Sequence, residues 1–575
     1  MAEGSFTCKN VMRKVLSAYD VEQRIITRLS KLVVDAEMTF KEALESSVEL
    51  TLYMNNNPSI KRDIEVLEGL MSHESKHAAG IVISPIPLDN ILPVKRDGDD
   101  HTMLKCQFHK KIIEKLGILK FDFLGLKTLS LLADTLKLIK NNYNIDIDLD
   151  SIDVEDPGIY EVMNSGEFLG VFQFSEPSGK QAIERIKPTN FNDLIAGNAL
   201  CRPGVKERDL YYANKFKVDI VYNSAIVEEI LKETSGAIIY QEQTMLLMNK
   251  LAGWSLGKAD KMRKVKDLEE YREDFVNGCI GNGYTSVFAN EIYDRFSLEY
   301  SFNKSHAACY ALIAAQCAWL KKYYYIEFMT ALLSKELNSS NGKEQIPLII
   351  SAVMANGIHI KTPDINKSIN EFTCINDTIF YPLSAIDKVG DTIVEKIIEE
   401  RKNGEFTSLD NFISRFAKRD INKNTGQMLI KAGCFDAFNI NRCLLLQEFF
   451  NTRGIKETAR VYSEKVIMQY ELQTLGIYLT FDPLSDYPKR KFSELKETGD
   501  DYIYGIISNV SKIKDRNNNS MAFISVNTKA DNIGCIMFRD RLELYGNQLL
   551  INLPVVIKGN KSSDKFKINE ITFIG

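Results

Sequence analysis

The sequence has few of the features that mark several common classes of protein. Its ten cysteines are scattered and form no C-x-x-C pair, so free thiols in a reducing compartment are expected rather than a zinc site or a disulfide framework. The most apolar long stretch, ACYALIAAQCAWLKKYYYIEF, contains Gln316, Lys321 and Lys322 and is too interrupted to span a bilayer. The N-terminus has no apolar signal core. We therefore expect a cytoplasmic protein with no membrane partner.

The sequence also has no excess of basic residues. Its 72 Lys and Arg are balanced by 77 Asp and Glu, and the formal net charge is -5 at pH 7. This balance argues against a protein that wraps nucleic acid over its whole surface. It still permits a basic cleft on an acidic body, because a charged ligand responds to the local field rather than to the sum of the charges.

Changes in hydrophobic periodicity and in Gly and Pro content along the chain predict a multidomain α+β fold. Helical periodicity dominates residues 1–76, and short β-rich runs punctuated by prolines follow in residues 77–126. Residues 127–340 are mostly amphipathic helices with short Gly and Pro breaks. Residues 341–480 mix short helices with a small extended unit, and from about residue 501 the pattern alternates like the strands of a small β-barrel.

The stretch GILKFDFLGL places one carboxylate inside a strongly apolar run. Side chains alternate along a strand, so Leu119, Phe121 and Phe123 are expected to point into a core. Lys120 and Asp122 then share the opposite face. A carboxylate beside an ammonium suits a site in which Asp122 binds Mg²⁺ and Lys120 neutralises phosphate charge. The open alternative is a solvent-facing strand with a weak ion pair.

A second acidic motif, NIDIDLDSIDVED, follows soon after. Asp146, Asp148 and Asp150 alternate with Ile and Leu, so they would line one face of a strand, as the carboxylates of a two-metal nucleotidyl transferase do. The alternative is an acidic surface connector between two helices. We favour the connector, because no glycine or basic partner is close by and a DPG turn comes next.

Three further segments carry residue types that bind phosphate. In the segment FNKSHAACYAL, a helix capped by Asn303 or Ser305 would place Lys304 and His306 at its positive end. The alternative for His306 is a hydrogen-bonded structural histidine. For the basic run SLGKADKMRKVK, the alternative is a solvated helix face. The candidate residues are Arg202 in CRPGV, Lys261, Arg263 and Lys264 in SLGKADKMRKVK, and Lys304 and His306 in FNKSHAACYAL.

The stretch SAIDKVGDTIVEKIIEERKNGEF predicts a helix-hairpin-helix motif. Ile386 and Val389 are apolar positions just before a tight turn at Gly390, and helices are expected on both sides of this turn. The turn amides of such a motif contact a DNA phosphate without reading the bases. Asp391, directly after the glycine, is unfavourable for an anion.

The C-terminal strands combine basic residues with aromatic residues. Tyr502 and Tyr504 suit the stacking of single-stranded DNA on the barrel surface. The alternative for any of these aromatics is a place in the barrel core, and we expect the core for Phe523 and Phe538.

Several stretches, in one order, resemble a single family. They are HAAGIVIS, EKLGILKFDFLGLKTL, GVFQF, IKPTNFNDLIAGNALCRPG, IIYQEQTMLLMNKLAGWSLGKAD, SFNKSHAACYALIAAQCAWLK and YELQTLGIYLTFDPL. Through them the chain resembles the bacterial replicative C-family DNA polymerase, the DNA polymerase III alpha subunit, from about residue 5 to the end. The resemblance implies a thumb-like helical region in 1–76, part of the palm in 77–126, fingers in 127–340, a clamp-binding-like region with the helix-hairpin-helix in 341–490 and an OB domain in 495–575.

The resemblance also implies roles for single residues. It makes Asp122 the third catalytic aspartate and a metal ligand, and Lys120 the lysine that contacts the incoming triphosphate. It places the basic candidates in the fingers, which bind nucleotide and template: Arg202, Lys261, Arg263, Lys264, Lys304 and His306.

The implied activity is template-directed DNA synthesis by two-metal nucleotidyl transfer. Its substrates are primer-template DNA and deoxynucleoside triphosphates, its cofactor is Mg²⁺, and a sliding clamp is a further candidate partner. The strand with the family's first two catalytic aspartates is not in the sequence, so we expect a separate N-terminal polymerase chain and no activity from this chain alone. The alternatives are a catalytically inactive DNA-binding polymerase remnant and a rearranged enzyme that uses Asp146 and Asp148.

Overall fold

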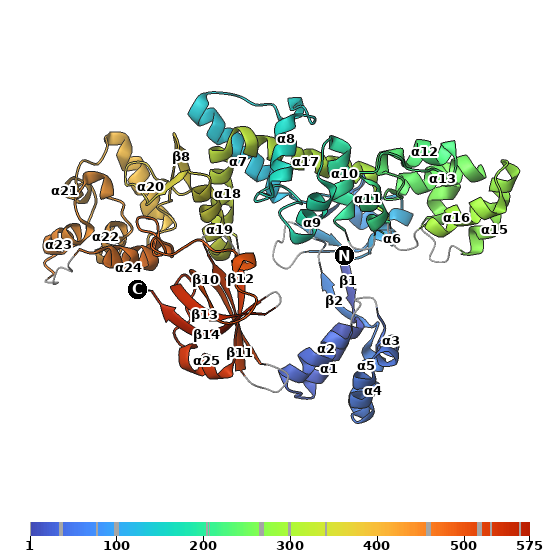
Figure 1. Ribbon diagram of the computed structural model, residues 1–575, viewed down its shortest axis with the longest axis horizontal. Coiled ribbons are helices and arrows are strands. Elements are labelled where there is room, and N and C mark those ends of the chain that lie inside the picture. The colour runs from blue at the N-terminus through green and yellow to red at the C-terminus, as the bar shows by residue number, and fades with distance from the viewer. Residues whose placement is uncertain are drawn as a thin grey trace. The chain divides into compact units, whose positions relative to one another are not determined.

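A computed structural model describes most of the chain, which folds into two compact units, Met1–Leu126 and Lys127–Gly575 (Figure 1). The described residues are 2–33, 38–75, 77, 79–96, 103–202, 205, 207–263, 269–296, 301–339, 342–455, 462–514, 520–528, 532–562 and 565–574. Within these residues every helix is either too short or too polar to cross a membrane.

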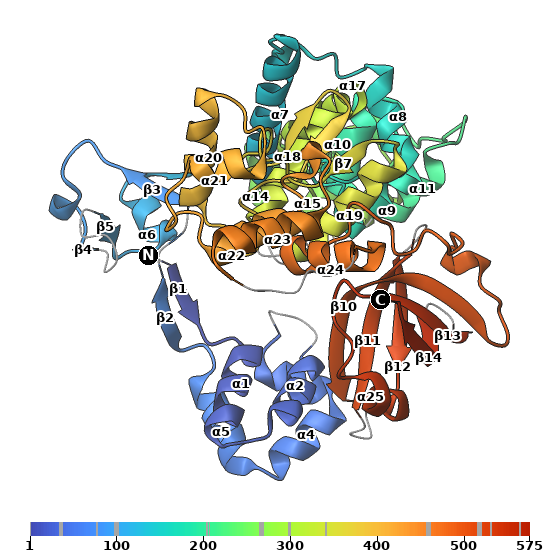
Figure 2. The ribbon, with the colours of Figure 1, turned by 90° about the vertical axis from the view of Figure 1, so that its left-hand side faces the viewer.

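The first unit opens with a helical bundle attached to a short β-ladder (Figure 2). The helices are α1 (Cys8–Ala18), α2 (Gln23–Leu32), α3 (Phe40–Ser46), α4 (Val48–Asn55) and α5 (Pro58–Leu67), and the ladder pairs β1 (Ala2–Ser5) with β2 (Met71–Ser75). Val11 and Val15, one helical turn apart, are buried in a shared core. Thr39 is the N-cap of α3 and forms a capping box with Glu42. Its hydroxyl accepts from the Glu42 N–H, and the Glu42 carboxylate accepts from the Thr39 N–H. The predicted helical periodicity is confirmed.

The rest of the first unit consists of short strands around a small core. The elements are β3 (Gly80–Ile83), β4 (Val94–Arg96), β5 (Leu104–Cys106), α6 (Lys110–Lys115) and β6 (Leu119–Asp122). β3 pairs antiparallel with β6, and β4 pairs antiparallel with β5. Leu92, Ile113 and Ile118 lie in the core, and Val82 of β3 packs against it. The core therefore covers one face of the β3–β6 ladder.

The second unit is built around α17, which packs against α8 and α10. The helices of this layer are α7 (Lys127–Tyr143), α8 (Pro157–Ser165), α9 (Pro177–Ile186), α10 (Phe191–Leu200), α11 (Arg208–Asn214), α17 (Lys304–Tyr323), α18 (Tyr325–Leu337) and α19 (Gly342–Ala355). α17 buries Ala307, Ala311, Ala314 and Ala318. Such small side chains along one stripe allow neighbouring helices to approach closely.

A separate core lies under the helices between α11 and α17. These helices are α12 (Ala225–Leu231), α13 (Gln241–Ala252), α14 (Leu256–Met262), α15 (Glu269–Gly281) and α16 (Ser286–Arg295). Phe275 is at the centre of this core, and its ring meets those of Trp254 at 5.9 Å and Phe296 at 5.3 Å in edge-to-face geometry. The prediction of a mostly helical region over residues 127–340 is confirmed.

The next region combines a small sheet with short helices. Its elements are β7 (His359–Lys361), β8 (Thr373–Ile375), β9 (Thr378–Phe380), α20 (Asp391–Glu400), α21 (Leu409–Ser414), α22 (Lys423–Lys431), α23 (Arg442–Thr452) and α24 (Glu464–Leu475). Phe449 of α23 belongs to the same hydrophobic core as Leu131 of α7. The packing is therefore continuous from the α17 layer into this region.

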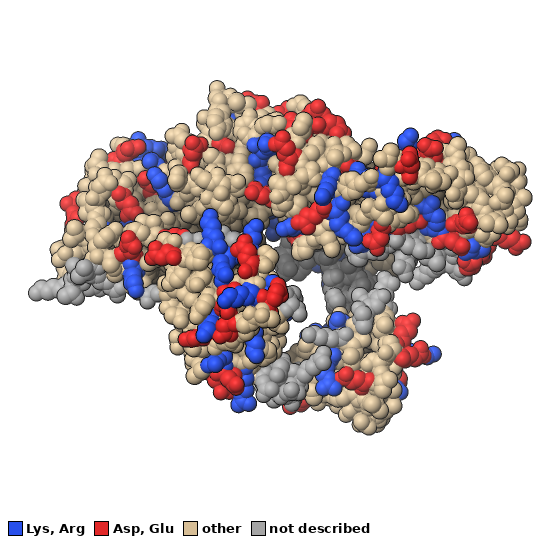
Figure 3. All heavy atoms as spheres, in the orientation of Figure 1, with Lys and Arg blue, Asp and Glu red and all other residues tan. Residues whose placement is uncertain are grey.

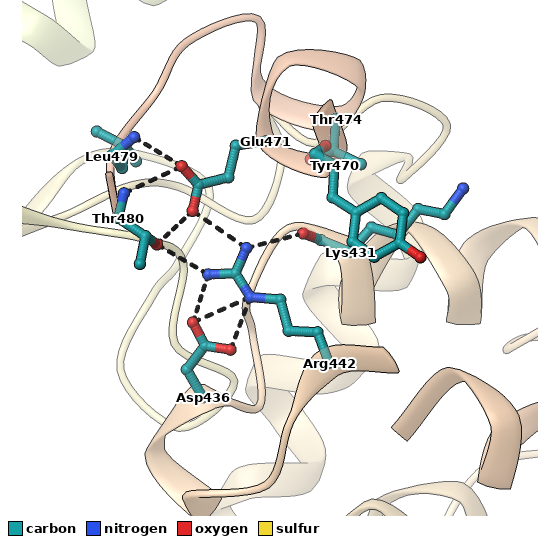
Figure 4. A network of polar contacts seen from close by, with 8 residues as sticks. All are labelled: Lys431, Asp436, Arg442, Tyr470, Glu471, Thr474, Leu479 and Thr480. Carbon is teal, nitrogen blue, oxygen red and sulfur yellow. Dashed lines mark hydrogen bonds and ion pairs between the residues drawn. The ribbon is translucent and has the colours of Figure 1, made fainter. Parts of the chain in front are cut away.

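A buried network of polar contacts holds this region together (Figure 4). The Arg442 guanidinium donates to Asp436 at 2.5 Å, to Glu471 at 3.1 Å and to the Thr480 hydroxyl at 3.0 Å. The Glu471 carboxylate also accepts from the N–H groups of Leu479 at 2.7 Å and Thr480 at 3.0 Å. Each buried charge is thus paired and hydrogen-bonded, which a buried ion pair requires.

The C-terminal segment forms a closed barrel with strand order β10-β11-β12-β14-β13 (Figures 1 and 2). The strands are β10 (Asp501–Lys514), β11 (Ser520–Asn527), β12 (Asn532–Met537), β13 (Pro554–Ser562) and β14 (Lys565–Phe573), and α25 (Arg539–Tyr545) connects β12 to β13. A parallel pairing of Cys535 with Phe566 closes it. Closure leaves no open sheet edge, and the predicted OB-type barrel is confirmed.

Candidate functional site

Strand β6 places Lys120 and Asp122 next to each other on one face. The Lys120 Nζ lies 2.5 Å from the Asp122 Oδ1, and the His77 Nδ1 lies 3.6 Å from the same oxygen. The Lys120 side chain is 12% exposed, whereas that of Asp122 is 41% exposed. The carboxylate is therefore open to solvent, while the lysine stem is packed beneath it. The predicted alternation is confirmed.

A glycine makes room for this pair. Gly80 of β3 lies directly opposite Asp122 in the ladder. A Cβ at position 80 would come within 2.8 Å of the Lys120 Cε and 3.3 Å of the Asp122 Oδ1. Neither His77 nor Gly80 was singled out by composition or spacing, although both belong to the stretch HAAGIVIS.

The electrostatics of the pair favour the charged form of Asp122. The hydrogen bond from Lys120 holds the pKa of the Asp122 carboxyl below its usual range, and the charges of Lys120, His77 and Lys110 act in the same direction. The carboxyl is ionised at neutral pH, so it is an anionic oxygen donor of the kind that Mg²⁺ prefers.

The opposite face of the β3–β6 ladder is apolar and exposed. Phe121 is 42% exposed and Phe123 is 65% exposed, and Leu119 is exposed with them. Ile81 and Ile83 lie across from Phe121 and Leu119 in the register and are exposed as well. The prediction that Leu119, Phe121 and Phe123 point into a core is therefore wrong for this structure: they share a face, but the small core lies on the other side.

The acidic run after α7 is a connector. Asp148 caps the 3₁₀ turn Leu149–Ser151, where its carboxylate accepts from the Asp150 N–H. Asp146 pairs with Lys140 of α7 at 2.6 Å. No strand forms here, so the connector hypothesis is confirmed and the alternative of a strand lined with carboxylates is wrong. Across the described part of the chain, no three His, Cys, Asp or Glu side chains are grouped so as to hold a metal ion.

The N-terminus of α17 is capped as predicted, but its basic residue is paired. Asn303 is the N-cap and accepts from the His306 N–H at 2.8 Å. The Lys304 Nζ lies 2.6 Å from Glu233, and the Lys304 N–H donates to Glu242 at 3.0 Å. Two carboxylates, which sequence reasoning missed, therefore occupy the positive end of this helix.

The other basic candidates that the structure describes lie on or near the surface. Lys261 on α14 is exposed, and the Arg263 guanidinium pairs with Asp260 at 2.7 Å. Arg202 is exposed, and its carbonyl accepts from Arg208 at 2.7 Å. Lys264 lies outside the described residues.

The helix predicted after Gly390 forms, but the helix predicted directly before it does not. Gly390 is the N-cap of α20, with extended backbone. Before it, residues 383–388 form turns and bends, and Lys388 has a left-handed φ of 61°. Ile386 and Val389 are buried, as core residues of the unit rather than of a preceding helix.

Aromatic and basic side chains share the barrel surface. The Tyr504 ring stacks on Tyr487 at 5.0 Å and on Tyr502 at 6.5 Å. The Lys567 ammonium lies 5.3 Å above the ring of Phe538, which is exposed, so the prediction of a core position for Phe538 is wrong. Phe523 is half-buried beneath Lys565. Figure 3 shows basic side chains on the visible face of the barrel.

Three family models match the chain. The model of the bacterial DNA polymerase III alpha NTPase domain matches residues 1–125, and that of the bacterial DNA polymerase III alpha subunit finger domain matches residues 128–283. The model of the helix-hairpin-helix motif matches residues 357–445.

Curated relatives match nearly the whole chain. The DNA polymerase III subunit alpha of Campylobacter jejuni is 33% identical over 95% of this chain and 50% of the relative. The protein of the same name from Borreliella burgdorferi is 33% identical over 98% of this chain and 54% of the relative, and that from Thermus aquaticus is 30% identical over 96% and 50%. The chain therefore spans about half the length of the curated relatives it matches.

Proposed function

This chain belongs to the bacterial DNA polymerase III alpha family, and we propose that it contributes part of the palm, the fingers and DNA-binding surfaces to a replicative DNA polymerase. The single observation that carries the proposal is the Lys120–Asp122 pair, 2.5 Å apart on one face of β6 with the carboxylate open to solvent. The reaction joins a deoxynucleotide to a primer: the 3′ oxygen forms a bond to the α-phosphorus, and pyrophosphate leaves. We place this activity in the cytoplasm, where bacterial DNA is copied.

Asp122 fits one position of a magnesium site. Enzymes hold Mg²⁺ through one or two carboxylates together with substrate phosphates, and Asp122 offers one ionised carboxylate. The chemistry that two such ions would supply, when bound, is activation of the 3′ hydroxyl and stabilisation of the leaving pyrophosphate. Lys120 would turn from Asp122 toward the triphosphate and neutralise part of its charge.

We propose that a separate N-terminal polymerase chain supplies the other two catalytic aspartates and covers the apolar face of β3 and β6. This face exposes Ile81, Ile83, Leu119 and Phe121. Burial of apolar surface contributes about 25 cal/mol per Å², so an exposed apolar strand face favours a protein partner. By itself one carboxylate does not hold two metal ions, and the chain alone is expected to be inactive.

In the fingers, we propose that basic side chains contact the incoming nucleotide and the template. Lys304 is the first residue of α17, and its present partner is the side chain of Glu233 at 2.6 Å. A phosphate group that reaches the N-terminus of α17 must displace this carboxylate. The further members of the proposed contact set are Arg202, Lys261, Arg263, Lys264 and His306.

DNA beyond the active site is proposed to follow two surfaces. The amides around Gly390, at the start of α20, contact a duplex phosphate. The stacked rings of Tyr487, Tyr502 and Tyr504 offer a platform for the bases of the single-stranded template. A sliding clamp is a further candidate partner of residues 341–490.

Co-purification tests the proposal. The chain is expressed with the candidate N-terminal polymerase chain, and the complex is assayed for primer extension with Mg²⁺. Stable association with extension that neither chain gives alone supports the split enzyme. A complex that binds primer-template but never extends it favours the second candidate function, a DNA-binding polymerase remnant. The basic and aromatic side chains on the barrel surface are the observation that supports this second candidate. Extension by the purified chain alone contradicts the requirement for a partner.

A further inference from the structure

A pocket of about 340 Å³ opens on the second unit, where α7 ends and α17 passes into α18. Residues that line it include Tyr143, Tyr323, Tyr324, Tyr325, Glu327 and Asn356. The Tyr143 and Tyr324 rings are 6.1 Å apart and tilted by 55°. The pocket thus combines several aromatic rings with one carboxylate. Its lining contains none of the candidate DNA or nucleotide contacts named above.

The carboxylate of this pocket is buried and bonded to neutral groups. Glu327 is 1% exposed. Its Oε1 accepts from the Asn142 Nδ2 at 2.9 Å, and it also shares a hydrogen bond with the Tyr143 hydroxyl. These bonds reduce the cost of burying the carboxylate.

Acidic residues surround the pocket. Burial raises the pKa of Tyr143 to about 12, and the negative charges of Glu327 and Asp377 act in the same direction. On the outside, the Tyr323 hydroxyl donates to Asp156 at 2.9 Å. Acidic side chains gather above α8, at the top of the view in Figure 3. The exposed acids of the α7–α8 connector and of α8 are Asp146, Asp148, Asp150, Asp153, Glu155 and Glu161.

The one basic side chain of the lining is already paired. The Lys322 Nζ lies 2.5 Å from the Glu161 Oε2 on α8. The local field at the pocket is therefore negative, and it favours a cation over the phosphates of a nucleic acid.

We propose that this pocket is a docking site for a basic segment of a partner protein, which places an arginine side chain against the tyrosine rings and toward Glu327. A guanidinium is planar, stacks on aromatic faces and pairs with carboxylates. The site is independent of the polymerase assignment, since it uses none of the residues proposed to contact DNA or nucleotide.

The test is a binding titration of the full chain with a short fluorescein-labelled peptide of glycine, serine and arginine, followed by anisotropy at low salt. A peptide with citrulline in place of arginine keeps the shape and removes the charge. The arginine peptide is expected to bind at least about tenfold more tightly than the citrulline peptide, because only the guanidinium carries a charge that the acidic pocket attracts. Tenfold in affinity corresponds to about 1.4 kcal/mol.

Surface variants then locate the binding. Tyr323→Ala removes a ring of the pocket and is expected to weaken the arginine peptide about tenfold, whereas Tyr323→Phe keeps the ring and the binding. Tyr462→Ala is the matched control, because Tyr323 and Tyr462 are both 49% exposed and Tyr462 is not part of the pocket lining. These variants leave the buried Glu327 intact, so folding does not confound the result.

Three results would overturn the proposal. The first is equal binding of the arginine and citrulline peptides, or binding of neither. The second is an arginine affinity that Tyr323→Ala leaves unchanged. The third is binding of a labelled oligothymidylate that is lost in Tyr323→Ala and kept in Tyr462→Ala, which would assign the pocket to nucleic acid.

Discussion

Gly80 lies directly opposite Asp122 in the β3–β6 ladder, and a methyl group at position 80 would come within 2.8 Å of the Lys120 Cε. The glycine therefore sets where the lysine ammonium sits relative to the carboxylate. The absence of a side chain at position 80 of β3 thus leaves room for the Lys120 side chain on the paired strand β6.

Gly80→Ala is expected to lower primer extension by the reconstituted complex about tenfold or more, since small displacements of a catalytic group are costly. The clash is with the far end of a flexible side chain, so the free energy of unfolding should change by less than about 1 kcal/mol. Gly125→Ala is the control, because nothing lies within 4 Å of a Cβ there. Equal activity of the two variants would show that Gly80 does not position Lys120.

Phe121→Ser tests the exposed apolar face. The side chain is exposed, so the stability of the chain alone should stay within about 0.5 kcal/mol of wild type. Its affinity for the N-terminal polymerase chain, measured by calorimetry, should fall about tenfold or more, because the buried ring is lost from the interface. Leu52→Ser, at another exposed apolar residue on α4, should leave this affinity unchanged. Equal losses in both variants would contradict docking on this face.

Lys321 predicts a specific pH dependence of stability. It is buried and donates to the carbonyls of Glu167 and Leu169, and burial lowers its pKa to about 8. The unfolded lysine keeps a pKa of about 10.4. Between these pH values the unfolded state holds a proton that the folded state has released. Burial of the charged lysine therefore lowers the free energy of unfolding by its full amount below about pH 8, and this penalty disappears as pH rises toward 10.4.

Urea titrations of wild type and Lys321→Gln at several pH values measure this effect. The difference in the free energy of unfolding, wild type minus variant, should rise by about 3 kcal/mol from pH 8 to 10.4, at about 1.36 kcal/mol per pKa unit. Taking the difference cancels the tyrosines and cysteines that titrate in the same window. A flat difference would show that Lys321 keeps an ordinary pKa.

Arg442→Met should be strongly destabilising. It leaves Glu471, which is fully buried, without its guanidinium. Loss of one partner of a buried pair costs about 3–5 kcal/mol. Arg539→Met breaks the exposed pair with Glu543 and should cost less than about 1 kcal/mol. Thermal unfolding of both variants checks the contrast, and equal shifts in Tm would contradict the structural role of the network.

The alternation of Lys120 and Asp122 was predictable because the strand period is a local property of the backbone. The burial of the other face was not, since periodicity says which side chains share a face and not what covers it. The sequence period therefore did not indicate that Phe121 and Phe123 are exposed.

The prediction of a helix directly before Gly390 failed for a related reason. Ile386 and Val389 are apolar and buried, but they reach the core from consecutive turns rather than from a helix. Likewise, nothing near Lys304 in the sequence indicated that Glu233, which is 71 residues away, would pair with it. Such contacts depend on tertiary packing, which single-sequence patterns do not specify.

We propose that Asp122 is one carboxylate of a catalytic metal site. The most direct measurement is primer extension by the reconstituted complex that carries Asp122→Asn. Asp146→Asn is its matched control, because Asp146 also pairs with a lysine, Lys140 at 2.6 Å, on an exposed surface. We predict that Asp122→Asn lowers the rate at least about a thousandfold and that Asp146→Asn leaves it unchanged. Extension by Asp122→Asn at the wild-type rate would contradict the account.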